Sequence, residues 1–222
     1  MSRPLLLDLY CGAGGAAVGY HRAGFEVVGV DIAPQPNYPY RFIQADVLDL
    51  GEFTAYDLEA AAIHASPPCQ AHSQQTQDRT KHTNLIPETR DLLERSGLPY
   101  VIENVVGAGK HLIDPVRLCG SSFGMNVQRH RLFETNWALL GQPCDHSWWT
   151  PRFRSLRIDY HRAGKLAKVV GVHGHLNYPG EFPIRCEAME IDWMTNAELV
   201  QSIPPKYTEY IGEQLINQIG GE

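Results

Sequence analysis

The sequence predicts an α/β fold in which helices cover a mostly parallel sheet and a small lobe is inserted late in the chain. Apolar, strand-like runs alternate with helix-like segments over the first two-thirds of the sequence, as is typical of parallel sheets. A glycine-rich turn separates the first strand-like run from the first helix-like segment. From about Gly141 the clean periodicity is lost, so the sheet should end before that point.

Four apolar runs are predicted to be strands, and they span residues 5–10, 26–31, 61–66 and 100–105. Two intervening segments, 15–23 and 85–96, have the composition and spacing of helices. Open sheets of this kind bind ligands at the carboxyl ends of their strands. The residues that follow each apolar run are therefore the first candidates for a functional site.

The chain is predicted to have three parts. A protein of 222 residues can bury one substantial core, and residues 1–140 are expected to form this main domain. Residues 141–192 are rich in Trp, Pro, Arg and His, and we expect them to form a small lobe with room for only a few strands. Residues 193–222 return to helical spacing around a Pro-Pro break, so we expect them to pack back on the main domain.

Composition bears on the cellular compartment. The longest apolar runs are strand-sized, so we expect no membrane span or secretory signal and a cytoplasmic protein. Five cysteines are an odd number for a disulfide framework, which favours reduced thiols.

Cysteines and histidines in the second half of the chain raise the question of a zinc site. The candidates are Cys119, Cys144, His146, His173, His175 and Cys186. Their spacing matches no known metal-binding pattern, so we expect no metal.

The segment from Asp8 to Gly15, DLYCGAGG, places glycines directly after the first strand and before the first helix. Glycines let a ligand approach the backbone, and a helix N-terminus offers free amides. The next strand ends in Asp31, where an acid can accept hydrogen bonds from ribose hydroxyls. Together these features indicate a nucleoside cofactor, although such a turn can also merely close a strand–helix junction.

Cys69 follows two prolines at the end of the third predicted strand. Prolines fix the backbone and can hold the thiol at a set angle. A lone cysteine at a strand end is more often a small buried residue. Here a polar loop containing Gln70 and Ser73 follows it, which favours a thiol that faces a site.

Glu103 and Asn104 end the fourth predicted strand, which puts them near Cys69 if the two strands are neighbours. Arg129 and Arg131 alternate and should share one face of an extended segment. Two cations on one face can hold an anion or donate hydrogen bonds to a carbonyl.

Four motifs in this order, DLYCGAGG, PPCQ, ENV and QRHRLF, resemble those of the DNA cytosine carbon-5 methyltransferase family. The resemblance covers roughly residues 4–137 and, more loosely, 194–215. It implies a Rossmann-like, mostly parallel sheet of the S-adenosylmethionine-dependent methyltransferase type. It also implies methyl transfer to carbon 5 of cytosine without a metal.

The resemblance implies a role for each motif residue. Cys69 would be the nucleophile that adds to carbon 6 of the base, because carbon 5 is a poor nucleophile until that addition occurs. Glu103 would bind ring nitrogen 3 and the amino edge. Arg131, with Arg129, would contact the base carbonyl and hold the site. We further expect the substrate to meet Gln70, Ser73 and Asn104.

The implied cofactor is S-adenosylmethionine, with S-adenosylhomocysteine as product. Asp31 would bind the ribose, Asp46 the adenine amino group, and Ile32 the adenine face. The remaining residues expected around the cofactor are Tyr10, Gly12, Gly14, Gly15 and Pro68.

Several positions depart from the family pattern. Tyr10 and His72 stand where the family usually has Phe, Val127 stands where it has Gln, and Glu213 stands where it has Asn. These changes bear on specificity more than on the chemistry.

The net charge of −6 requires any nucleic-acid-binding surface to be local. The lobe supplies one, since Arg152, Arg154 and Arg157 lie in a basic stretch, although such a stretch can also be a solvated loop. We expect a monomer acting on duplex DNA with a flipped cytosine, compatible with a phage or restriction-modification enzyme. The alternatives are the same chemistry on tRNA or another nucleic acid, and a catalytically silent nucleic-acid-binding protein.

Overall fold

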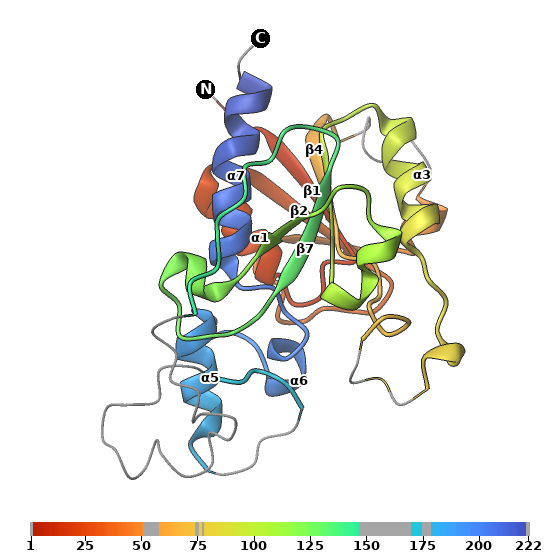
Figure 1. The fold of residues 1–222 in the computed structure, drawn as a ribbon. Coiled ribbons are helices and arrows are strands. Elements are labelled where there is room, and N and C mark those ends of the chain that lie inside the picture. Colours follow the sequence, from red (N-terminus) through yellow and green to blue (C-terminus); the bar gives the residue numbers. More distant parts are fainter. Residues whose placement is uncertain are drawn as a thin grey trace.

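A seven-stranded sheet with the order β3-β2-β1-β4-β5-β7-β6 forms the centre of the computed structural model (Figure 1). The structure describes residues 2–50, 58–73, 76, 78–146, 170–174 and 179–220. The strands are β1 (Leu5–Leu9), β2 (Glu26–Asp31), β3 (Arg41–Gln44), β4 (Ala60–Ala65), β5 (Tyr100–Asn104), β6 (Val116–Leu118) and β7 (Arg131–Thr135). The four strands expected from the sequence are thereby confirmed.

The first five strands of the chain pair in parallel, whereas β7 runs antiparallel to both β5 and β6. The sheet is therefore mixed but mostly parallel, as predicted. Three of its strands are not among the four predicted ones, although β7 begins in the segment around Arg129 and Arg131 that was expected to be extended. β3 is a four-residue edge strand whose residues are only partly buried or exposed, and β6 is a three-residue edge strand, so neither has a clear apolar pattern.

The helices are α1 (Gly15–Ala23), α3 (Ile86–Ser96), α5 (Glu181–Met189), α6 (Asn196–Leu199) and α7 (Pro205–Gly220). Short 3₁₀ turns are η1 (Val47–Asp49), η2 (Arg79–Lys81), η3 (Val106–His111) and η4 (Gly120–Phe123). Both helices predicted in the main domain are confirmed, as is helical structure on both sides of the Pro-Pro break. α5 was not predicted, because the sequence between residues 141 and 192 has little clean periodicity.

Alternate residues of the central strands fill two separate cores. Leu6 and Val101 belong to the core beneath α1 and α7, whereas Leu7 and Ile102 belong to the core beneath α3. Figure 1 shows α1 and α7 on one side of the sheet and α3 on the other. Both faces of the sheet are therefore covered, as parallel sheets require.

Residues after position 169 also contribute to the core beneath α1 and α7. Val170, Val172 and Met189 belong to the same buried cluster as Leu6. Residues 147–169, which include Arg152, Arg154 and Arg157, lie outside the described residues. Among the described helices, none is long and apolar enough to cross a membrane.

Helices α1 and α7 pack closely because small residues line their contact. A Cβ atom at Gly19 would overlap the Thr208 hydroxyl and the Pro205 carbonyl, and it would lie 2.6 Å from the Glu209 amide nitrogen. The Thr208 hydroxyl donates to the Ala16 carbonyl at 2.8 Å, which joins the two helices. This contact holds the end of the chain against the helix that starts at the glycine-rich turn.

We expect Gly19→Ala to lower the free energy of unfolding by about 1–3 kcal/mol, since the added methyl group meets backbone atoms that cannot rotate away. Urea unfolding monitored by circular dichroism measures this change. Gly109→Ala is the control, because its Cβ would meet only the end of the Leu132 side chain at 3.3 Å. Equal stability of the two variants would contradict this account of the helix contact.

Candidate active site

A pocket of about 420 Å³ opens at the carboxyl edge of the sheet, between the ends of β1 and β4. The chain leaves these two neighbouring strands toward opposite sides of the sheet, which is where open α/β sheets bind ligands. Its lining comes from four segments that are far apart in sequence. The lining residues lie within 8–16, 31–35, 66–70 and 197–203, and Glu103, Val105 and Arg131 complete the wall.

The glycine-rich turn after β1 forms one half of the pocket. Gly12 has a φ of 49°, and no atom would lie within 4 Å of a Cβ placed there. Its amide donates to Asp31 Oδ2 at 3.0 Å, while the Ala33 amide donates to Oδ1 at 3.0 Å. These two bonds fix the Asp31 carboxylate at the pocket wall, with acceptor capacity left for a ligand.

The residues predicted to hold a cofactor divide into two groups. Those that line the pocket are Tyr10, Gly12, Gly15, Asp31, Ile32 and Pro68. Gly14 is not among the lining residues; it precedes α1 with a φ of 86°. Asp46 is also outside the lining; its carboxylate accepts from the Leu48 amide at 3.0 Å and caps η1.

Cys69 reaches the pocket on a loop that is anchored from below. Asn104 donates its side-chain amide to the Pro67 carbonyl at 2.9 Å, and the amides of His72 and Ser73 donate to the Cys69 carbonyl at 2.9 and 2.8 Å. Burial raises the pKa of the Cys69 thiol, the charge of Glu103 raises it further, and that of Arg131 lowers it. The resting group is therefore a thiol that needs a base or a ligand to ionise.

Glu103 and Arg131 form an ion pair beside the thiol, with 2.9 Å between Arg131 Nε and Glu103 Oε1. Antiparallel pairing sets Glu103 opposite Phe133 and Asn104 opposite Leu132, so Arg131 lies just beyond the end of β5. Burial raises the pKa of the Glu103 carboxyl, and the charges of Arg131 and Arg129 oppose that rise. The carboxyl can therefore hold a proton more readily than a surface glutamate can.

Arg129 lies near this pair but does not line the pocket. Its terminal nitrogens donate to the carbonyls of Val172 at 2.8 Å and Val200 at 2.7 Å, and its own carbonyl accepts from the Tyr207 hydroxyl at 2.6 Å. Burial and the charge of Arg131 lower the pKa of Arg129. Arg129 thus joins three segments of the chain behind the site.

Only some of the other residues predicted to meet the substrate line the pocket. Gln70 lines the pocket, whereas Ser73 and Asn104 support the loop from outside it. The basic residues of the lobe fall outside the described part of the chain, as stated above. The sequence therefore predicted which loop reaches the pocket. It did not distinguish the residues that line the pocket from those that hold the loop in place.

Three buried oxygen atoms on lining residues lack a hydrogen-bond partner within the described structure. They are Asp8 Oδ1, Gln70 Oε1 and Glu103 Oε1. The ion pair to Arg131 is short, but it does not meet the geometry of a hydrogen bond at Oε1. Buried polar atoms are almost always satisfied, so these three point to a polar ligand in the pocket.

The far wall of the pocket was not predicted, and it comes from α6 and the residues that follow it. Thr195 and Glu198 form a capping box that starts α6, and Glu198 accepts from the Asn37 side chain at 3.0 and 3.1 Å. The T-x-x-E pattern could have revealed this helix start. Its position over the pocket depends on contacts that are distant in sequence.

The comparisons with known proteins agree with this geometry. Residues 5–112 match the protein family described as C-5 cytosine-specific DNA methylase. No curated protein matches the sequence significantly.

Solved structures share the fold along the full length of the chain. A prophage-encoded Escherichia coli protein, described as a DNA modification methyltransferase, matches with a TM-score of 0.65 and 16% identity over 99% of this chain and 100% of its own. The S. pombe Dnmt2 methyltransferase matches with a TM-score of 0.62 and 14% identity over 98% and 99% of the two chains. Entamoeba histolytica methyltransferase EhMeth gives 0.58 and 14%, with 99% of each chain covered. These likenesses confirm the predicted methyltransferase type of sheet.

The charges around Cys69 predict opposite changes in the alkylation rate of its thiol when Glu103 or Arg131 is replaced. In Glu103→Gln a negative charge beside the thiolate is lost, so the pKa of Cys69 should fall and its alkylation by iodoacetamide at mildly alkaline pH should become faster. In Arg131→Gln a stabilising positive charge is lost, so alkylation should become slower. Peptide-resolved mass spectrometry measures both rates. Changes of the same sign in the two variants would overturn this view of the site.

Proposed function

We propose that this chain, whose residues 5–112 match the C-5 cytosine-specific DNA methylase family, transfers a methyl group from S-adenosylmethionine to carbon 5 of a cytosine in DNA. One observation carries the proposal. Cys69, Glu103 and Arg131 line the same pocket as the glycine-rich turn and Asp31. A nucleophile, a proton-holding carboxyl and a guanidinium thus meet next to a nucleoside-binding turn.

The pocket fits the cofactor on three grounds. Its volume of about 420 Å³ lies within the usual range of small-molecule sites, roughly 300–1,000 Å³. Asp31 can accept from ribose hydroxyls, and Ile32, which is 65% exposed, presents an apolar face to an adenine ring. Asp8 Oδ1 has no hydrogen-bond donor among the described residues and can accept from a polar group of the methionine part. When bound there, S-adenosylmethionine supplies an electrophilic methyl group.

In the proposed reaction the Cys69 thiolate adds to carbon 6 of the base. Glu103 holds a proton on ring nitrogen 3, which neutralises the charge that the addition would otherwise create there. Carbon 5 becomes enamine-like and takes the methyl group, with S-adenosylhomocysteine as the leaving group. Carbon 5 then loses its proton to water while Cys69 leaves carbon 6 as the thiolate. Arg131 keeps the Glu103 carboxyl oriented and is close enough to the pocket to donate to the base carbonyl.

The raised pKa of Glu103 supports this role. A carboxyl whose pKa is raised by burial can share a proton with the base, whereas a fully ionised surface carboxylate could only accept hydrogen bonds. Glu103 Oε1 is ion-paired with Arg131 but accepts no hydrogen bond within the described structure, so it is available to the exocyclic amino group. Cytosine presents this pairing of ring nitrogen and amino group along one edge.

We propose duplex DNA as the substrate, with the target cytosine flipped out of the base stack, because carbon 5 and carbon 6 are otherwise covered by neighbouring bases. The basic stretch containing Arg152, Arg154 and Arg157 is the proposed phosphate-binding surface on a chain of net charge −6. Methylation of tRNA by the same residues is the second candidate.

We expect label from tritiated S-adenosylmethionine to enter duplex DNA and to be absent from free cytidine nucleotide and from tRNA. Scintillation counting of each purified acceptor gives the result. Label in tRNA alone would refute DNA as the substrate but leave the chemistry intact. Label in none of the acceptors would favour a silent nucleic-acid-binding protein.

We expect Cys69→Ala to reduce methyl transfer by at least about 1,000-fold, because removal of a covalent nucleophile closes the reaction path. Binding of S-adenosylhomocysteine, measured by calorimetry, should stay within about two-fold, because other residues form that half of the pocket. Cys186→Ala is the matched control, since Cys186 is a free thiol outside the pocket lining. Substantial turnover by Cys69→Ala would rule out the covalent route.

A further inference from the structure

A second group of reactive side chains lies away from the pocket. Cys119, His130, Cys144 and His146 each direct one possible ligand atom toward the others, and all four atoms lie within 4.8 Å of one another. None of the four lines the pocket described above. We propose that these four residues bind one zinc ion and that the ion fastens the segment leading into residue 147 to the catalytic sheet.

The distances fit a tetrahedral ion. With Zn–S of about 2.3 Å and Zn–N of about 2.0–2.1 Å, neighbouring sulfur and nitrogen ligands lie about 3.5 Å apart. Cys119 Sγ lies 3.4 Å from His146 Nε2, and Cys144 Sγ lies 3.5 Å from His130 Nε2. The rings of His130 and His146 have centroids 5.2 Å apart and are tilted by 55°, so they do not stack flat on each other. Two edges of the expected tetrahedron are therefore already present.

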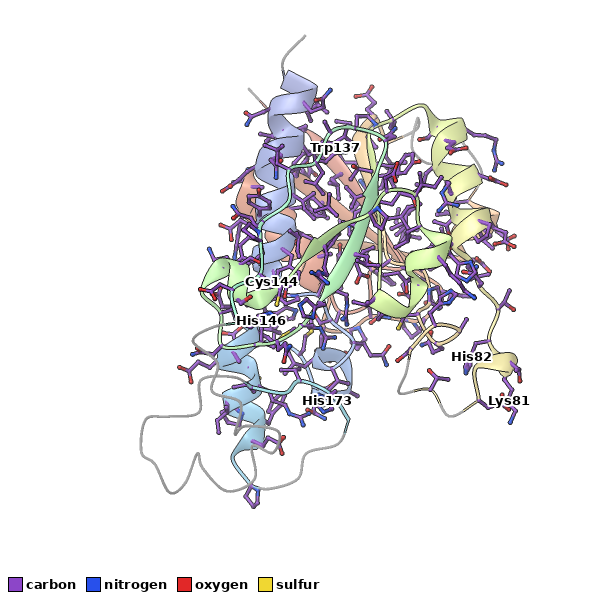
Figure 2. The ribbon with its side chains drawn as sticks, viewed as in Figure 1. Lys81, His82, Trp137, Cys144, His146 and His173 are labelled. Atoms are coloured by element: carbon purple, nitrogen blue, oxygen red, sulfur yellow. The ribbon has the colours of Figure 1, made fainter. Side chains whose placement is uncertain are left out.

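The ligands come from three places that the fold brings together. Cys119 directly follows β6, His130 directly precedes β7, and Cys144 and His146 lie on the segment that follows β7. Figure 2 shows Cys144 and His146 close together on that segment, with His173 apart from them. Since β6 and β7 are paired neighbours, the first two ligands are held by the sheet itself.

Contacts independent of a metal hold the remaining two ligands in place. The Ser122 hydroxyl, in η4, donates to the Pro143 carbonyl at 3.1 Å. Farther back, the Leu140 amide donates to Gln214 Oε1 at 2.9 Å, and the Tyr210 hydroxyl donates to the Leu140 carbonyl at 3.1 Å. The segment is thus tied to η4 and to α7 before it reaches Cys144, which makes the site preorganised.

The ligand set indicates the metal and its role. Two thiolates and two imidazoles are a common tetrahedral zinc set, and four protein ligands leave no open position for substrate. This set of four ligands therefore indicates a structural zinc ion and not a catalytic one.

This proposal replaces the expectation of no metal that the sequence spacing gave. The candidates considered there omitted His130, and they included Cys186 and His173, which do not belong to the cluster. His175 lies outside the described residues. Only Cys144 and His146 are close in sequence, so no short motif marks the site.

The position of His130 connects the ion to the active site. His130 stands between Arg129, which braces the site from behind, and Arg131, which pairs with Glu103. A metal bond to His130 would restrict the backbone that carries both arginines. This connection rests on the proposed function, whereas the metal site itself does not.

Metal analysis of the untagged, full-length protein tests the site directly. We expect one equivalent of zinc per chain by mass spectrometry of the metal content. Replacement of zinc by cobalt(II) should give the intense visible bands of a tetrahedral thiolate complex. Cys144→Ala and His146→Ala should each weaken zinc binding by at least about 100-fold, since loss of a residue that only supports a ligand already costs about 10- to 100-fold.

Cys186→Ala is the control for cysteine loss and should bind zinc as the unchanged protein does. Circular dichroism of each variant separates loss of the site from loss of the fold, because both replaced ligands are only partly buried. The proposal fails if the reduced, folded protein takes up no zinc or cobalt(II), or if the protein as purified holds a Cys119–Cys144 disulfide and no metal. It also fails if Cys144→Ala and His146→Ala bind zinc normally. None of these outcomes depends on methyl transfer.

Discussion

The ion pair between Glu103 and Arg131 is the interaction on which the rest of the site depends. A buried carboxyl is costly unless a positive group compensates it, and Arg131 can do so only because β7 runs antiparallel to β5. That orientation brings the start of β7 to the edge where the parallel strands end. Arg131 then faces Glu103, and the same turn of chain carries Arg129 behind the site and His130 toward Cys144 and His146. One reversed strand thus links the pocket, its bracing and the proposed zinc site.

Sequence patterns predicted those parts of the fold that depend on residues close together in the chain. The glycine-rich turn, the loop at Cys69 and the strand ending in Glu103 lie where parallel-strand geometry puts them, and this is why most predicted pocket residues line it. Contacts between distant segments were not predictable. No short stretch of sequence indicates that Arg129 braces the site, that α6 forms the far wall, or that Cys119 lies beside His146.

Different interactions shape the two halves of the pocket: hydrogen bonds around the glycine-rich turn, and burial around Cys69. Around the glycine-rich turn, backbone amides fix Asp31, and the open space at Gly12 admits a ligand close to the chain. Around Cys69, burial dominates: it keeps the thiol protonated and raises the pKa of Glu103. Unsatisfied oxygens in both halves leave polar groups for ligands to bind. A polar, ordered half suits a cofactor, while a buried half with shifted pKa values suits the reacting base.

The central claim is that Cys69 forms a covalent bond to a cytosine during methyl transfer, and trapping measures it most directly. A duplex oligonucleotide containing 5-fluorocytosine blocks the final proton loss, so the adduct accumulates when S-adenosylmethionine is present. Intact mass spectrometry should then show protein plus oligonucleotide plus one methyl group, and the cross-linked peptide should contain Cys69. Cross-linking through another residue, or methyl transfer to unmodified DNA with no adduct on the fluorinated duplex, would contradict the account.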